Sequence, residues 1–287
     1  MDQFSQFTCR PENQEMVSPG LISSLGIAPE DIYASVENIT AIAAAAGKSA
    51  GRGFALLPFC HTVEAKAMGA DIRPADDTAG PRAGAYTLND PGELPPVDIS
   101  ASADAARLLR ASSALRDGGW RVVYQLSGPI SIFSCMTPLS GLFKCWRKTP
   151  ETVGASLDRL QDMLSRFTAD LCEAGVEYIS YSDPAGNANI LGPKYGSLLT
   201  ERFTLPFLKR IREICGDRCS LLICGRLPFF GRASPRRRAG RRRHRRLLRQ
   251  TRRLYEIEKL QTSLNRQTLA KRERRRGGEV LGEMLRV

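Results

Sequence analysis

The stretch that most constrains the fold is Val176–Gly196, which reads VEYISYSDPAGNANILGPKYG. It begins with a short apolar run rich in strand-favouring residues, and it breaks at Ser182-Asp183-Pro184 into a loop of Gly, Asn and Pro. Helical patterns flank it, over Thr152–Ala174 before it and from about Leu198 to Ile214 after it. This order predicts an α/β unit of a parallel sheet, in which the loop after the strand carries the chemistry. We therefore predict that Asp183 lies on the rim of an active site.

Other short apolar runs alternate with helical patterns along the chain. They predict further strands at Phe54–Leu57, around Asp71–Pro74, at Arg121–Leu126 and at Ser220–Cys224. Predicted helices cover Leu21–Gly47, Thr62–Gly69, with Thr62 as the N-cap, and Ala103–Leu115, while Ile130–Trp146 predicts a short buried helix and a bend. The Gly- and Pro-rich segment Asp76–Pro96 is predicted to be a long loop. The alternation predicts an α/β fold, either a β/α barrel or a doubly wound sheet, and spacing alone does not choose between them.

Composition limits the cellular setting. No apolar run among the 287 residues approaches the roughly 20 that a membrane span needs. The first residues lack the basic and apolar regions of a secretory signal. The eight cysteines form no compact framework, so we expect a cytoplasmic protein with reduced thiols that are mostly core or surface residues.

Charge divides the chain into two parts. Residues 226–287 carry 21 Lys and Arg against 5 Asp and Glu, a net +16, so residues 1–225 carry −4 of the total of +12. Arginine almost completely replaces lysine in this tail, a bias typical of GC-rich DNA translated out of frame. We expect a domain over 1–225 and a tail over 226–287 that is out of frame. The alternatives are a disordered tail and an arginine-rich arm that binds nucleic acid.

Several motifs resemble those of the uroporphyrinogen decarboxylase superfamily. They are LPFCHTVEAKAMGADI (Leu57–Ile72), LSGPISI (Leu126–Ile132), the helix from Thr149-Pro150-Glu151, YSDPAGNANILGPKYG (Tyr181–Gly196) and LLICG (Leu221–Gly225). They are most similar to the corrinoid-dependent methyltransferase branch, of the methylcobamide:coenzyme M methyltransferase type. The resemblance runs from about residue 17 to 225, and it lacks the arginine-rich N-terminal motif of the decarboxylase branch.

The resemblance implies a (β/α)8 barrel of the TIM type, with its site at the carboxyl ends of the strands. It also implies methyl transfer from a partner corrinoid (cobalamin) protein to a small thiol substrate. The matched region is shorter than the roughly 250 residues of a typical barrel, so we expect an incomplete barrel.

The resemblance further implies zinc, which the family binds through a His-x-Cys pair and a distant second Cys. The Cys of this pair falls on Cys224, but the position two before it is Leu222. The histidines of the chain are His61 and His244, and no cysteine follows Cys224. One thiolate does not make a zinc site, so zinc is doubtful here and we expect an impaired copy.

Five other residues are candidates for the rim of the site, and each has a structural alternative. Asp183 either binds a ligand or forms an Asx-type turn. Glu64 either lines the site or supports a helix N-terminus, and His61 is a weaker candidate for a ligand or base. Gly128 and Pro129 either set a turn or bring the backbone close to a ligand.

The sequence therefore predicts a corrinoid-dependent methyltransferase. The alternative enzyme is a uroporphyrinogen decarboxylase, whose carboxylate-bearing tetrapyrrole would need several cationic side chains in the cleft. The alternative of another class is a nucleic-acid-binding protein that uses the tail.

Overall fold

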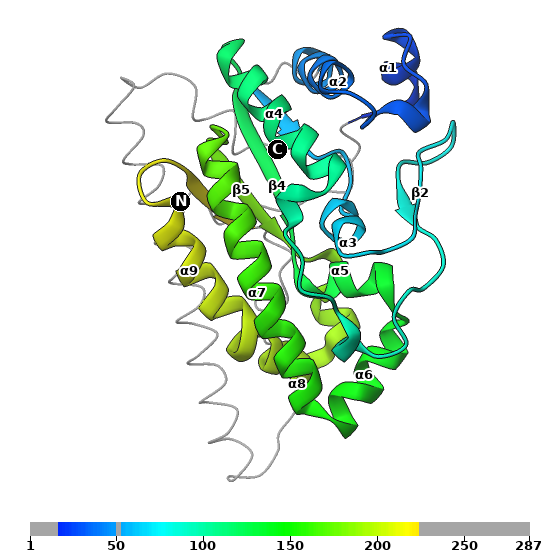
Figure 1. The fold of residues 1–287 in the computed structure, drawn as a ribbon, viewed down its shortest axis with the longest axis vertical. Helices are drawn as coiled ribbons and strands as arrows, with labels where there is room; N and C mark the ends of the chain where they lie inside the picture. Colours follow the sequence, from blue (N-terminus) through cyan, green and yellow to red (C-terminus); the bar gives the residue numbers. More distant parts are fainter. Residues whose placement is uncertain (1–16, 50–52, 224–287) are drawn as a thin grey trace, which may run out of the picture.

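The core of the protein is a four-stranded parallel sheet (Figure 1). The computed structural model describes residues 17–49 and 53–223. The sheet contains β1 (Phe54–Leu57), β4 (Arg121–Ser127), β5 (Tyr178–Ser182) and β6 (Ser220–Ile223), in the spatial order β1-β4-β5-β6. Each neighbouring pair is parallel, which confirms the predicted arrangement of these four segments.

The helices that precede the strands pack on one face of the sheet. These helices are α2 (Val36–Ser49), α4 (Ala103–Asp117), α7 (Pro150–Glu173) and α9 (Leu205–Cys215). Tyr124 of β4 points into this layer, where its ring packs edge-on against Phe167 of α7 at 5.5 Å. On the opposite face, Phe54, Val123 and Tyr178 form a separate small cluster. Sequential strand order with this one-sided helix layer is the arrangement of a β/α barrel segment, not of a doubly wound sheet, in which helices cover both faces.

A second group of helices follows the carboxyl ends of the strands. It comprises α3 (Val63–Ala67), α5 (Pro129–Met136), α6 (Leu139–Lys148), η6 (Pro184–Gly186), α8 (Ala188–Leu199) and η7 (Thr200–Thr204). In Figure 1, α5, α6 and α8 gather at the lower end of the sheet. This end is therefore where the loops predicted to carry the chemistry come together.

The structure corrects three predicted elements. The predicted helix 21–47 is broken into α1 (Pro19–Ser24), η3 (Pro29–Asp31) and α2. The predicted strand near residue 72 exists as β2 (Ile72–Arg73), but it pairs antiparallel with β3 (Arg82–Ala83), outside the parallel sheet. The predicted loop 76–96 contains β3 and η4 (Pro91–Glu93), and η5 (Ile99–Ala101) follows it.

A fourth correction concerns the segment after Asp183. The sequence predicts a loop up to about Leu198, but α8 already begins at Ala188. The side chain of Asn187 caps this helix by accepting from the amides of Asn189 and Ile190. Gly192, with φ of +63°, kinks the helix immediately before Pro193, so the two residues that suggested a loop instead bend a helix.

Within the described ranges, no helix has both the length and the apolar character needed to cross a membrane. Cys224 and the basic tail 226–287 lie outside the described residues.

Candidate active site at the carboxyl ends of the strands

Asp183 joins the loop after β5 to the helix after β4. Its side chain is 3% exposed, and its carboxylate accepts hydrogen bonds from the amides of Ile130 (3.2 Å) and Ser131 (2.7 Å) and from the Ser131 hydroxyl (2.7 Å). These donors belong to the first turn of α5, so the carboxylate satisfies amides that have no partner within the helix. Burial raises the pKa of Asp183 to about 6, against the opposing effect of the hydrogen bonds from Ser131. Asp183 thus lies at the carboxyl end of β5, with its oxygens bonded to the first turn of α5.

Gly128 and Pro129 form the start of α5 beside this carboxylate. Pro129 occupies the first turn, where a missing amide hydrogen costs nothing. The Gly128 amide donates to the carbonyl of Ser182 at 2.7 Å and holds the two loops together. A Cβ at Gly128 would lie 2.5 Å from Cβ of Asp183, so the close approach itself requires glycine. Both residues set the turn, and the turn positions Asp183.

Glu64 lies in the first turn of α3, near the ends of β1 and β4. Its side chain is 0% exposed, and Oε1 accepts from the Ser127 amide at 3.3 Å. Its second oxygen, Oε2, is buried and has no hydrogen-bond partner among the described residues. Burial raises the pKa of Glu64. A buried carboxyl with one unsatisfied oxygen and a raised pKa is a candidate functional group.

His61, in the segment that follows β1, lies near Ser127. Its Nδ1 lies 3.5 Å from Oγ of Ser127, and burial lowers the pKa of its imidazole, which favours the neutral ring. Ser127 therefore contacts His61 through its hydroxyl and Glu64 through its amide. The structure thus forms two groups. Glu64 and His61 lie around Ser127, at the ends of β1 and β4, whereas Gly128, Pro129 and Asp183 lie together at the ends of β4 and β5.

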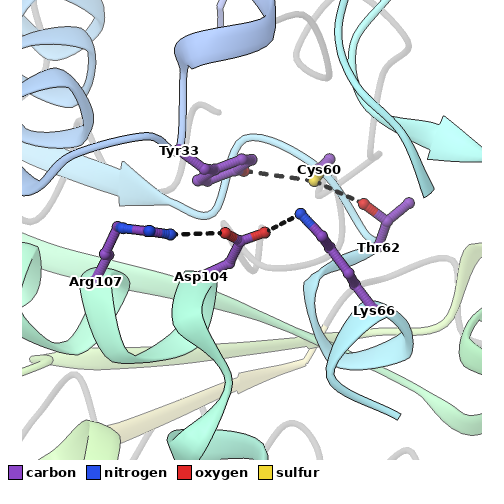
Figure 2. Close-up of polar contacts among 6 residues, drawn as sticks. All are labelled: Tyr33, Cys60, Thr62, Lys66, Asp104 and Arg107. Carbon is purple, nitrogen blue, oxygen red and sulfur yellow. Dashed lines mark hydrogen bonds and ion pairs between the residues drawn. The ribbon is translucent and has the colours of Figure 1, made fainter. Parts of the chain in front are cut away.

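Sequence reasoning missed a second polar group behind Glu64. The hydroxyl of Tyr33 accepts from the Phe59 amide at 2.7 Å and lies 3.4 Å from Sγ of Cys60, which in turn lies 3.1 Å from Oγ1 of Thr62 (Figure 2). Thr62 occupies the predicted N-cap position of α3, but its side chain does not cap the helix. Burial raises the pKa of Cys60, which keeps it a thiol. The sequence signal for Cys60 and Thr62 was their position shortly after β1.

Two cations near this end of the sheet share one carboxylate. Lys66 of α3 and Arg107 of α4 both pair with Asp104, at 2.6 Å and 3.1 Å (Figure 2). The hydrogen-bond partners of Glu64 and Asp183 found among the described residues are serines and backbone amides. The candidate site is thus built from buried carboxyls and hydroxyls.

The described residues do not reproduce the zinc ligands that the sequence resemblance implies. Leu222 stands in β6 where that pattern has a histidine, and it packs against the cluster of Phe54, Val123 and Tyr178. Cys224 lies outside the described residues, and His61 contacts Ser127. Within the described ranges, the one group of three potential metal ligands is Cys172, Cys215 and Cys219, which is not at this end of the strands.

Removing the Ser131 hydroxyl tests the bridge between the two loops. Ser131→Ala leaves Asp183 without one hydrogen bond and also removes the 3.1 Å bond from the Ala185 amide to Ser131. Because both partners are buried or partly buried, we expect a loss of about 1–3 kcal/mol in the free energy of unfolding, measured with urea. Ser134→Ala is the matched control, since its hydroxyl bonds the carbonyl of Ser131 within the same helix and its loss should cost less than about 0.5 kcal/mol. Equal losses in the two variants would contradict the bridge.

The pKa of Asp183 predicts a pH dependence of stability. A folded-state pKa of about 6 exceeds the unfolded value near 3.9, so the folded protein holds this proton more tightly. The protonated Asp183 carboxyl therefore makes its full contribution to the free energy of unfolding below about pH 4. This contribution is lost as the pH rises to about 6, a change of roughly 3 kcal/mol. The difference in unfolding free energy between wild type and Asp183→Asn should change by that amount across this window. Parallel pH curves for the two proteins would show that Asp183 has an ordinary pKa.

Comparisons with known proteins identify relatives. The profile of the family "Uroporphyrinogen decarboxylase (URO-D)" matches residues 22–234 and so continues past Gly225, where the sequence motifs end. Two curated forms of methylcobamide:CoM methyltransferase MtaA from Methanosarcina barkeri, one of them from strain Fusaro, are each 22% identical, over 179 and 178 residues. The alignments cover 61% and 60% of this chain and 53% and 52% of the relatives, so the chain spans about half their length.

A solved structure has the same fold. A methyltransferase from Methanosarcina mazei superposes with a TM-score of 0.63 at 20% identity, over 74% of this chain and 63% of that protein. This likeness supports the assignment of the sheet as part of a barrel.

Proposed function

The chain belongs to the uroporphyrinogen decarboxylase family, and we propose that it transfers a methyl group from a corrinoid-bearing protein to a small thiol. The curated relatives are named as methylcobamide:CoM methyltransferases, which is the branch that the sequence motifs indicate. We infer its activity, substrates and cytoplasmic location from the site and from the similarity to these relatives, of which the chain spans only part.

The observation that carries the proposal is the chemistry of the carboxyl-end site. A tetrapyrrole that bears several carboxylates needs cations to bind it. Among the described cations, Lys66 and Arg107 share the single carboxylate of Asp104, and the carboxyl of Glu64 would repel such a substrate when ionised. A thiol, by contrast, needs a group that takes its proton. The site therefore favours methyl transfer to a thiol over decarboxylation of a porphyrinogen.

In this proposal, Glu64 is the proton acceptor. The thiol sulfur forms the new S–C bond as the cobalt–carbon bond of the methyl donor breaks, and the bonding electron pair leaves with the cobalt. The thiol proton passes to Oε2 of Glu64, the oxygen without a hydrogen-bond partner. Burial raises the pKa of Glu64, which makes it a stronger base than an exposed carboxylate. Asp183 acts as a positioning residue, since its oxygens hold the start of α5.

We further propose that the reaction is slow. A zinc-bound thiolate is a far better nucleophile than a thiol, but the described residues do not supply the ligand set that the family motif requires. Glu64 then has to activate the thiol without that help. The expected result is methyl transfer faster than the uncatalysed reaction and slower than that of the Methanosarcina barkeri relative.

A substrate comparison tests the proposed function. The full chain is assayed for loss of methylcobalamin in the presence of 2-mercaptoethanesulfonate, and separately for consumption of uroporphyrinogen. Acceleration of the first reaction alone supports the proposal. Acceleration of the second alone would establish the decarboxylase alternative, and acceleration of neither would overturn the enzymatic proposal.

The basic tail stands apart from this site. We propose that the tail is read out of frame after residue 234, where the family match ends, because the net charge changes from −4 over residues 1–225 to +16 over residues 226–287 and lysine nearly disappears. Resequencing the gene and translating all three frames decides this, since a true continuation should restore strand and helix patterns. If no frame does so, binding of RNA or DNA that weakens steeply with salt would establish the tail as a nucleic-acid arm.

A further inference from the structure

Three cysteines meet at the end of the sheet opposite the candidate active site. Cys172 lies at the end of α7, Cys215 is the last residue of α9, and Cys219 immediately precedes β6. Because both helices run back toward the amino ends of the strands, this cluster lies where β5 and β6 begin, as the upper ends of α7 and α9 show in Figure 1. The cluster takes no part in the chemistry proposed above.

The geometry of the sulfurs is that of a metal site. The three Sγ atoms lie within 4.8 Å of one another, and those of Cys172 and Cys215 are 3.8 Å apart. Zinc–sulfur bonds of about 2.3 Å in a tetrahedron place neighbouring sulfurs roughly 3.8 Å apart. A disulfide needs about 2.05 Å, so these sulfurs are separate thiols at ligand spacing.

The local chain holds the three side chains in place. Cys215 and Cys219 have three residues between them, which is within the ligand spacing of structural zinc sites. Gly216, with φ of +50°, opens a turn in which the amides of Arg218 and Cys219 both donate to the carbonyl of Cys215. This turn brings Cys219 back over Cys215. The three cysteines are 6%, 2% and 4% exposed, from Cys172 to Cys219, so protein would surround three of the four ligand positions of a tetrahedral ion.

Positive charge beside the cluster favours thiolates. Arg218 lies in the same turn, with Nη1 3.9 Å from the carboxylate of Glu173, the neighbour of Cys172. Thiolates rather than thiols are metal ligands, and three of them with Zn²⁺ leave a net charge of −1 that a nearby guanidinium offsets.

We propose that Cys172, Cys215 and Cys219 bind a thiophilic cation of the Zn²⁺ class, which ties the ends of α7 and α9 to the start of β6. A tetrahedral ion takes its fourth ligand from water. This is a structural site, distinct from the zinc that the family motif implies near Cys224. The bound ion would join α9 to the start of β6, at the amino end of the sheet.

Metal binding by the full chain tests the proposal. The protein is reduced with a phosphine, freed of metal and titrated with Zn²⁺ against a chromophoric chelator. We expect one tight equivalent, and a loss of affinity of about 100-fold or more in Cys172→Ser, Cys215→Ser and Cys219→Ser. Cys145→Ser, which replaces a buried cysteine elsewhere, and Cys224→Ser should both keep the tight site.

Two readouts keep the test independent of activity and of folding failure. Cd²⁺ should give a sulfur-to-metal absorption band in wild type and in the two control variants. Zn²⁺ should raise the thermal midpoint of the same three proteins, because a ligand that binds only the folded state stabilises it. Loss of the tight site in Cys224→Ser alone, far less than one Zn²⁺ per wild-type chain, or a Cys172–Cys215 disulfide in the freshly isolated protein would each overturn the proposal.

Discussion

Glu64→Gln is expected to slow methyl transfer to the thiol by about 10²- to 10⁴-fold, the range typical of a lost general base. Glutamine keeps an oxygen that can accept from the Ser127 amide, and it is the same size as glutamate. It cannot take a proton from a thiol, so the loss should fall on kcat more than on KM. The measurement is single-turnover decay of methylcobalamin with an excess of protein.

Two controls give this result its meaning. Glu37→Gln makes the same chemical change on the exposed face of α2 and should leave the rate unchanged. The loss in Glu64→Gln should shrink when the thiol is supplied as a preformed thiolate at high pH, because the proton acceptor is then not needed. A variant that binds the thiol normally and transfers methyl at the wild-type rate would remove Glu64 from the mechanism.

Gly128→Ala is expected to have the largest effect on the structure of the site. The added methyl group would lie 2.5 Å from Cβ and 2.6 Å from Cγ of Asp183, and 2.8 Å from the hydroxyl of Tyr181. Cβ of Asp183 is fixed to its backbone, so the two loops must separate. We expect a loss of about 3 kcal/mol in unfolding free energy, at the upper end of ordinary overpacking, and a fall in methyl transfer of about 10²-fold as the site shifts.

Gly141→Ala provides the matched comparison for this substitution. Gly141 lies in the first turn of α6, and a Cβ there would meet Oγ1 of Thr137 at 3.6 Å, an ordinary contact. Alanine at that position should leave stability unchanged or raise it by up to about 1 kcal/mol. If Gly128→Ala were as stable as Gly141→Ala, the close packing of the two loops would not be a feature of the protein in solution.

The strands of the sheet could be predicted because each is a short apolar run between turn residues. Phe54–Leu57 was predicted with the observed bounds, and β4 and β5 differ from prediction only at their ends. The start of α8 could not be predicted, because Gly192 and Pro193 normally mark a loop and here kink a helix that Asn187 caps. The place of β2 outside the parallel sheet depends on its pairing with β3, which local sequence does not reveal.

The site was harder to predict than the fold. Motifs placed Glu64, Gly128 and Asp183 near one another, but the sequence did not show that Glu64 is completely buried with one oxygen unsatisfied. Nor did it show that Asp183 bonds the first turn of α5. The cysteine cluster was missed because Cys172 and Cys215 are 43 residues apart, and only the side-by-side packing of α7 and α9, which run in the same direction, brings their sulfurs together.

The most direct test of the methyl-transfer account is to follow the methyl group itself. Methylcobalamin with a deuterated methyl group is incubated with 2-mercaptoethanesulfonate and either wild-type protein, Glu64→Gln, or buffer, and the thioether is quantified by mass spectrometry. The account predicts deuterated methyl thioether above the buffer level with wild type, and a yield near that level with Glu64→Gln. Equal thioether in all three samples would contradict it.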